Sequence, residues 1–322
     1  MKEIISKMFA LKRQGCKQVG SMNKTAPTEE LVLDAYKSTL INTFKTAIDF
    51  FELNGIKWFA CGGTCLGAVR HQDIIPWDDD IDLFVYRDDY ERLFDIRESL
   101  EPYGLSMISI EDGYGYYNGY IKIFNNQTTL WELKEYESVV GVYIDVFPID
   151  KSDIGVSECL KIQKEYRDAL EKYRRGICKT SIKDLLDLFT HFHWGDLWYR
   201  ISCKMQFHNR KKEYNNLLES IRKVSFNSHG KHTMCVMGSY WERDHYPSEW
   251  FSETIEAPFG DFRVKLPVGY DEYLTQLYGD YMKLPPKEKQ VSHHDHYYCN
   301  LKEGLTLDEV KERINQGEFI VI

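Results

Sequence analysis

The stretch Trp58–Val85, WFACGGTCLGAVRHQDIIPWDDDIDLFV, contains the pattern that decides the fold. A short apolar run ends at Gly62-Gly63 and a second apolar run follows Asp82. Aspartates occupy four of the five positions from 78 to 82. Carboxylates beside two buried runs are costly to fold unless a cation neutralises them. The stretch therefore predicts two core strands joined around a cation-binding site.

Asp80 and Asp82 alternate along the run Asp80–Tyr86, which reads as a strand. Side chains at positions i and i+2 of a strand point to one face, about 6.5–7 Å apart, so both carboxylates can reach one hard cation. Ile81 and Leu83 would then enter the core. Because Mg²⁺ takes oxygen ligands and keeps water and substrate phosphate in its shell, two or three carboxylates are enough. We expect Mg²⁺ or Mn²⁺ here.

Asp145 is the natural third ligand. It stands alone in the apolar run GVYIDVF (141–147), where an unpaired charge would be expensive, so we expect this strand beside the strand of Asp80 and Asp82. These three aspartates are the predicted metal ligands and catalytic groups. Asp78 and Asp79 are expected to cap the loop or to bond Arg70 or His71, and a capped acidic loop without metal is the alternative for the whole cluster.

The residues Gly62, Gly63 and Thr64 are predicted to form a turn between a strand at 56–61 and a short helix at 64–70. Backbone N–H groups at such a helix start can hold a phosphate. Arg70 is the predicted clamp for a diphosphate, because its guanidinium fork matches phosphate oxygens. Lys122, in the predicted strand GYIKIF, is either a second phosphate cation or an exposed lysine of an edge strand.

A glycine turn after a strand, then D-h-D on a strand and later h-D-h, is the layout of the nucleotidyltransferase superfamily related to the polymerase β palm. Three motifs here resemble the LicD family of phosphocholine transferases, over about residues 28–300. They are GGTCLGAVRHQDIIPWDDDIDLFV, GVYIDVFPID and LYGDYMKLPPKEKQVSHH (277–294). Cys61 and Cys65 depart from the first motif, where aliphatic or small residues are more usual.

The resemblance implies transfer of a phospho-alcohol from a CDP-linked donor to a sugar hydroxyl of a glycan or glycolipid, with release of CMP. Choline is one such alcohol, and relatives such as fukutin-related protein handle ribitol phosphate. In the third motif, Lys289 and His293 are candidate contacts for the nucleotide or phosphate, with structural hydrogen bonding as the alternative. Two other functions stay open: a nucleotidyltransferase that releases pyrophosphate, and an inactive glycan-binding scaffold.

The remaining pattern predicts an α+β fold, a mixed sheet with helices like the polymerase β palm, plus a helical insertion. Residues 28–156 would form the catalytic core, 157–225 the helical segment, and 226–322 an α+β segment that completes the site. Within the core we expect a hairpin at 105–124 and a strand at 141–147 closed by Pro148. Thr306 and Glu309 form a capping box for a last helix, followed by a terminal strand.

Composition narrows the class of protein. The chain of 322 residues has a net charge of −9, which disfavours general nucleic-acid binding. Its eight scattered cysteines suit reduced cytosolic thiols, and it has no apolar run of about 18 residues. Residues 1–27 form a basic arm that either docks loosely on the protein or lies on an anionic membrane surface. We therefore expect a cytoplasmic protein, free or at the inner face of the membrane.

Overall fold

The computed structural model describes residues 29–113, 115–190, 193–206, 212, 214–217, 230–291 and 296–322. The predicted basic arm at 1–27 and the candidate ligand His293 lie outside the described residues.

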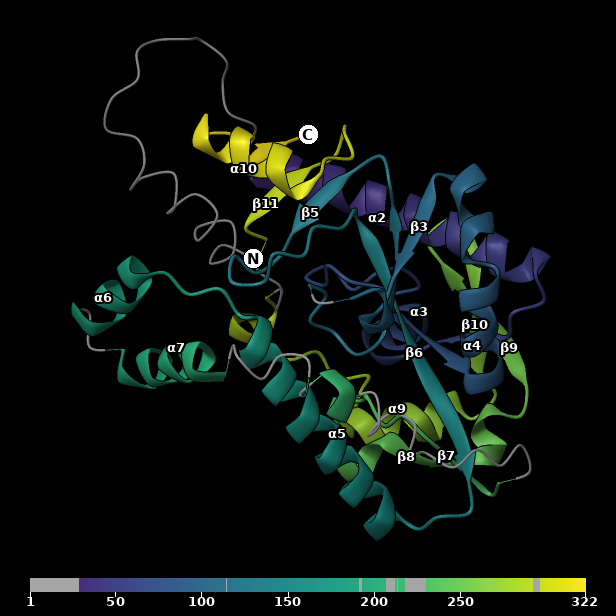
Figure 1. Cartoon of the computed structure of the whole chain (residues 1–322). Helices are drawn as coiled ribbons and strands as arrows, with labels where there is room; N and C mark the ends of the chain where they lie inside the picture. Colours follow the sequence, from purple (N-terminus) through teal and green to yellow (C-terminus); the bar gives the residue numbers. More distant parts are fainter. Residues whose placement is uncertain are drawn as a thin grey trace.

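A mixed sheet forms the centre of the molecule (Figure 1). Its strands run in the order β1-β2-β6-β4-β3, and β7 extends it from the far end of β6 and pairs with β8. The β2–β6 pair is parallel, and the other pairs of this sheet are antiparallel. Its strands are β1 (Trp58–Ala60), β2 (Asp82–Tyr86), β3 (Leu105–Ile108), β4 (Ile121–Asn125), β6 (Tyr143–Ser152), β7 (His232–Met234) and β8 (His245–Pro247).

Helices and smaller sheets surround these strands, as expected for an α+β fold; the likeness to the polymerase β palm stays a prediction. The α-helices are α2 (Glu29–Leu53), α3 (Gly62–Arg70), α4 (Arg87–Asp95), α5 (Val156–Ile177), α6 (Ile182–Thr190), α7 (Trp194–Gln206), α9 (Tyr270–Tyr278) and α10 (Leu307–Asn315). Short 3-10 helices span Arg97–Tyr103, Ile110–Asp112, Trp241–Asp244, Ser248–Phe251 and Lys287–Lys289. Of the helices in the described ranges, none has the length and apolar character needed to cross a bilayer.

Helix α2 shows why the core forms. Tyr36, Leu40, Phe44 and Phe51 recur at helical spacing and are buried, and α2 packs on β4 and β6. The helical character predicted for the segment from 157 onward is confirmed in α5, α6 and α7, which lie beside the sheet (Figure 1).

The prediction that Pro148 closes the central strand is wrong, because β6 continues to Ser152. Along one edge, β6 pairs with β4 at Tyr143–Val146 and with β7 at Asp150–Ser152. Pro148 falls between these two partners, where its missing N–H removes no bond to either strand. The strand therefore passes through the proline.

The predicted hairpin at 105–124 is confirmed as the antiparallel pair β3–β4, which a long connection at 109–120 joins. The C-terminal part adds a hairpin of β9 (Thr254–Phe259) and β10 (Phe262–Pro267), and a sheet of β5 (Thr129–Trp131), β11 (Tyr298–Asn300) and β12 (Ile320–Val321).

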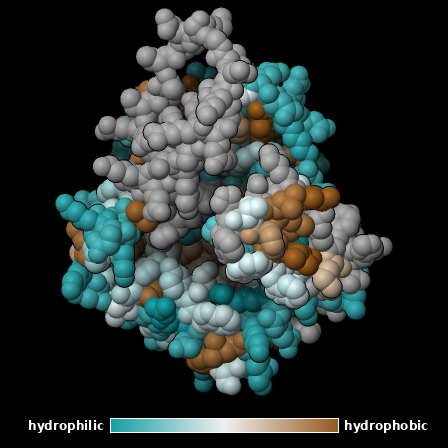
Figure 2. Space-filling view, turned by 90° about the vertical axis from the view of Figure 1, so that its left-hand side faces the viewer, coloured by the Kyte–Doolittle hydropathy of each residue, from teal (hydrophilic) through white to brown (hydrophobic). Residues whose placement is uncertain are grey.

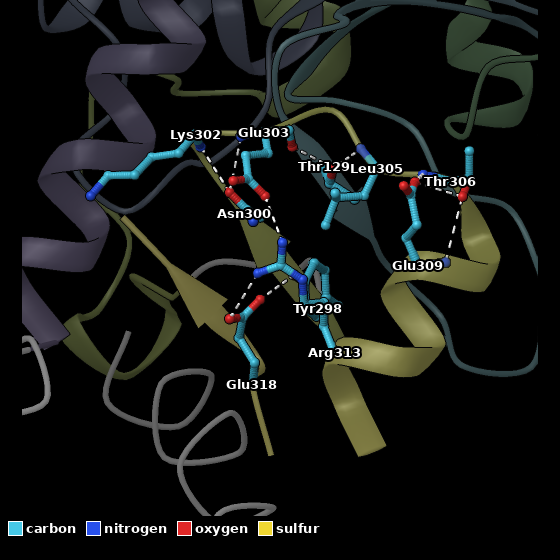
Figure 3. Close-up of polar contacts among 10 residues, drawn as sticks. All are labelled: Thr129, Tyr298, Asn300, Lys302, Glu303, Leu305, Thr306, Glu309, Arg313 and Glu318. Atoms are coloured by element: carbon cyan, nitrogen blue, oxygen red, sulfur yellow. Dashed lines mark hydrogen bonds and ion pairs between the residues drawn. The ribbon is translucent and has the colours of Figure 1, made fainter. Parts of the chain in front are cut away.

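Polar contacts hold the segment that follows β11 against β5 of this sheet (Figure 3). Thr129 of β5 donates its hydroxyl to the Glu303 carbonyl and accepts the N–H of Leu305, at 2.7 and 2.8 Å. Thr306 and Glu309 form the predicted capping box at the start of α10, and β12 is the predicted terminal strand. The sequence signal at this end of the chain is therefore confirmed.

Candidate active site

Three ionisable residues stand in one row across neighbouring strands. The register places Asp82 of β2 opposite Asp145 of β6, and Asp145 opposite Lys122 of β4. The predicted adjacency of the two aspartate strands is confirmed. The row forms because the parallel β2–β6 pair joins residues about sixty positions apart, with the Asp145 N–H donating to the Ile81 carbonyl at 2.8 Å.

Strand β2 begins at Asp82, so the predicted start at Asp80 is wrong by two residues. The alternation nevertheless holds, because Ile81 and Leu83 are fully buried and Asp80 and Asp82 are half-buried. Both aspartates line one pocket. The backbone N–H of Asp82 donates to Thr64 Oγ1 at 2.8 Å, which ties the strand start to α3.

That pocket has a volume of about 780 Å³ and combines carboxylates with basic groups. Asp78, Asp80 and Asp82 line it together with Arg70, Lys283 and Lys289. Five predicted site residues are thereby brought together: Gly63, Arg70, Asp80, Asp82 and Lys289. The other lining residues are Leu66, Ile75, Trp77, Ser239, Tyr240, Tyr278, Asp280, Tyr281, Leu284, Pro285 and Pro286.

The glycine segment differs from the prediction. Gly62 and Gly63 are the first residues of α3, so the helix starts two residues earlier than expected. Gly62 adopts a φ of +51° and donates its N–H to the Tyr273 hydroxyl at 2.8 Å. A Cβ on Gly63 would lie 2.5 Å from Asp78 Oδ2, so a larger residue here would force the Asp78 carboxylate to move. The segment therefore places α3 directly against the aspartate loop.

Asp78, Asp79 and Asp80 offer oxygen atoms that all lie within 4.8 Å of one another. Oxygen donors at this spacing suit a hard divalent cation. The aspartate loop also rests on α2, where the Tyr36 hydroxyl donates to the Asp79 carbonyl at 3.3 Å and Lys37 donates to the Pro76 carbonyl at 2.7 Å. The loop is thus a second candidate ligand set, which shares Asp80 with the predicted one.

Asp145 is buried behind the pocket and paired with Lys122. The lysine Nζ lies 2.9 and 3.3 Å from the two carboxylate oxygens. Burial raises the pKa of Asp145 to about 6, although the charge of Lys122 opposes the rise. Lys122 is 1% exposed in a strand flanked by β3 and β6, so the alternative of an exposed edge lysine is wrong.

Sequence reasoning missed Glu132, which completes this buried group. Its carboxylate lies 3.7 Å from Lys122 Nζ and accepts the hydroxyls of Tyr117 and Tyr143. Burial alone would raise the pKa of Glu132, but Lys122 and the two tyrosines hold it below its ordinary value. Lys122 Nζ also lies 3.0 Å from the centre of the Tyr143 ring. Nothing in the local sequence WELKEYE marks this glutamate.

Arg70 reaches the pocket from the end of α3. Its guanidinium donates to the Tyr281 carbonyl at 2.8 Å and lies 5.9 Å from the Trp77 ring centre. Tyr240 and Tyr278 meet hydroxyl to hydroxyl at 2.9 Å on the same pocket. The motif at 277–294 therefore contributes to this pocket with residues remote in sequence, and Tyr240 carried no signal that could have predicted it.

Comparison with known proteins gives the family. A family model described as "LicD/FKTN/FKRP, nucleotidyltransferase domain" matches residues 55–174. The lipopolysaccharide cholinephosphotransferase LicD of Haemophilus influenzae is 30% identical over 266 residues, which cover 77% of this chain and 91% of that protein. This chain belongs to the LicD family.

Two shorter matches cover smaller parts of the chain. Human ribitol 5-phosphate transferase FKRP is 44% identical over 50 residues, 16% of this chain and 10% of that protein. An uncharacterized protein of Rickettsia prowazekii, RP689, is 38% identical over 76 residues, 24% of this chain and 28% of that protein. The LicD resemblance read from the three motifs is confirmed.

Proposed function

We propose that this LicD-family chain transfers a phospho-alcohol, phosphocholine or a similar group, from a CDP-linked donor to a sugar hydroxyl of a surface glycan, releasing CMP. Homology supports a transferase, because the Haemophilus influenzae relative is a lipopolysaccharide cholinephosphotransferase. The observation that carries the finer proposal is the pocket, which places Asp78, Asp80 and Asp82 together with Arg70 and Lys289. A diphosphate bridged by a divalent cation needs both kinds of group.

The residues present fit a divalent cation. Asp80 and Asp82 face the pocket, Asp145 lies opposite Asp82, and the oxygens of Asp78, Asp79 and Asp80 lie within 4.8 Å of one another. We propose Asp80, Asp82 and Asp145 as ligands of Mg²⁺ or Mn²⁺, with Asp78 next to them. When bound, the cation would neutralise the diphosphate.

The chain's own residues would then position donor and acceptor. Arg70 and Lys289 bind diphosphate oxygens, assisted by the N–H groups of Gly63 and Thr64 in the first turn of α3. The acceptor hydroxyl attacks the phosphorus that carries the alcohol, the bond from that phosphorus to the bridging oxygen breaks, and CMP leaves. Asp145 accepts the hydroxyl proton as the general base. Lys122 keeps that carboxylate in place, and His293 stays a predicted nucleotide contact.

Turnover of the purified chain against a panel of CDP-alcohols tests the proposal. We expect CMP release that requires Mg²⁺, stops with EDTA and is abolished by Asp82→Ala. The matched control is Asp95→Ala, which removes an exposed aspartate at the end of α4. Release of pyrophosphate in place of CMP would identify a nucleotidyltransferase, and full activity of Asp82→Ala would rule out the assigned site.

A further inference from the structure

Helix α6 carries an apolar face that is largely exposed. Ile182, Leu186 and Phe189 are each more than half exposed. They stand at positions i, i+4 and i+7, so they project from one side of the helix. Figure 2 views the molecule from the side where α6 and α7 lie and shows hydrophobic atoms gathered there.

Helix α7 continues this face. Trp194, Trp198 and Met205 are also more than half exposed and share one side of α7. The rings of Phe189 and Trp194 meet edge to face with centres 5.4 Å apart, so the two helices present a single surface. We call these six residues, three from each helix, the α6–α7 face.

The α6–α7 face is not the side that holds the helix pair on the molecule. Cys203 of α7 is fully buried, and the Tyr199 hydroxyl lies 3.2 Å from that of Tyr136. Both residues lie on the side of α7 opposite Trp194 and Trp198. The exposed tryptophans are therefore additional to what the fold needs, and exposed apolar patches of this kind mark interaction surfaces.

A second pocket of about 780 Å³ adjoins the start of α6, because Ser181, next to Ile182, lines it. Its charged lining residues are four basic ones, Lys134, Lys179, Arg200 and Lys311, and two acidic ones, Glu135 and Glu137. Glu137 pairs with Lys179 and Lys311, and Glu135 with Arg200. Positive charge is thus in excess here, although the chain as a whole carries −9.

We propose that the α6–α7 face, with this basic pocket beside it, docks on an anionic phospholipid bilayer. Tryptophan and phenylalanine favour the boundary between headgroups and acyl chains, and lysine and arginine attract lipid phosphates. A protein partner would not require this pairing of aromatic residues with local basic charge. Docking would hold the transferase next to a lipid-anchored acceptor, and that consequence alone rests on the proposed function.

Co-sedimentation of the full chain with vesicles tests the docking. We expect binding to vesicles of phosphatidylglycerol and phosphatidylethanolamine, and a fall of about tenfold or more in the partition coefficient for Leu186→Ser/Trp198→Ser. The control is Leu53→Ser at the end of α2, since Leu53 and Trp198 are each 71% exposed. Lys134→Ala/Lys311→Ala should remove the preference over phosphatidylcholine vesicles and leave the remaining binding intact.

Three results would overturn the proposal: no sedimentation with either vesicle, equal sedimentation of the Leu186→Ser/Trp198→Ser variant, or a dimer that this variant dissociates in light scattering. The last would make the face an interface between two copies. Near-ultraviolet circular dichroism checks that the variants fold. CMP release measured with a soluble glycan acceptor should be unchanged in them, so a failure of docking is separable from a failure of the proposed activity.

Discussion

Two aspartates on strand β6, Asp145 and Asp150, differ in ways that separate the candidate site from the supporting structure. Both are buried, and each contacts a buried basic residue. Asp150 receives two bonds from Arg87, Nε to Oδ1 at 3.0 Å and Nη2 to Oδ2 at 2.9 Å. Its neighbour across the strands is Met234 of β7, so it lies away from the pocket.

Asp145 is neutralised less completely, because its basic partner, Lys122, also lies near a second carboxylate. Lys122 is a point charge that Asp145 shares with Glu132, and the neighbour of Asp145 on β2 is Asp82, which lines the pocket. A guanidinium fork matches both oxygens of one carboxylate, whereas an ammonium does not. Residue type and burial are alike in Asp145 and Asp150. The carboxylate that we propose to react differs from the structural one in the geometry of its cation and in having a neighbour, Asp82, that lines the pocket.

The largest expected effect comes from replacing Asp145, the carboxylate proposed to react. Asp145→Asn should lower CMP release about 10³-fold, because it removes a charge at the reaction centre. The free energy of unfolding should change by only about 1 kcal/mol, since burial opposes the ionised carboxylate and Lys122 keeps Glu132. Steady-state kinetics and urea unfolding measure the two quantities. A variant with near-normal turnover would place Asp145 with Asp150 as a structural residue.

The second test removes Arg87, the partner of the structural carboxylate Asp150. Arg87→Ala should destabilise the fold by about 3–5 kcal/mol, because it leaves the Asp150 carboxylate buried without its cation. KM and kcat of the protein that remains folded should be close to those of the wild type. Urea unfolding gives the stability, and Arg87→Met/Asp150→Leu, which removes both charges, should recover most of it. A selective loss of kcat would show that this pair also serves the site.

The smallest expected effect is a change in the pH dependence of stability, and it comes from another buried carboxylate, Asp244. Burial raises the pKa of Asp244 from 3.8 to about 6, against hydrogen bonds from the Tyr240 N–H and the Tyr246 hydroxyl. The folded state then binds the proton of Asp244 more tightly than the unfolded state, so the contribution of Asp244 to stability is highest at low pH and falls as pH rises from about 4 to 6.

In Asp244→Asn the amide oxygen can accept the Tyr240 N–H and the amide NH₂ can donate to the Tyr246 hydroxyl. The variant should remove about 2 kcal/mol of this pH dependence. Urea midpoints measured between pH 4 and 7 give the slope for wild type and variant. Asp145 also has a raised pKa, so its contribution to stability falls with rising pH as well. Some dependence of stability on pH should therefore remain in the variant. An unchanged slope in the variant would show that Asp244 titrates alike in the folded and unfolded chain.

Much of the site could be predicted from the sequence, because the side chains concerned are marked by short local patterns. Alternation of apolar residues with Asp80 and Asp82 gave the pocket-facing side of the strand, and a lone aspartate in an apolar run gave Asp145. Local patterns could not give element boundaries: α3 starts at Gly62 because tertiary contacts with Asp78 and Tyr273 favour a tight approach there. They also could not give Tyr240 or Glu132, which reach the site only through packing.

By itself, the sequence determined which strands carry carboxylates, which segments are helical and to which family the chain belongs, because periodicity and motif order are properties of the chain alone. Only the tertiary structure decided what each charge faces. Strand register sets Lys122 beside Asp145, and packing of β6 on α4 sets Arg87 against Asp150. Since the free energy of a buried charge depends on its partners in space, the roles of two aspartates in one motif could not be separated before that register was known.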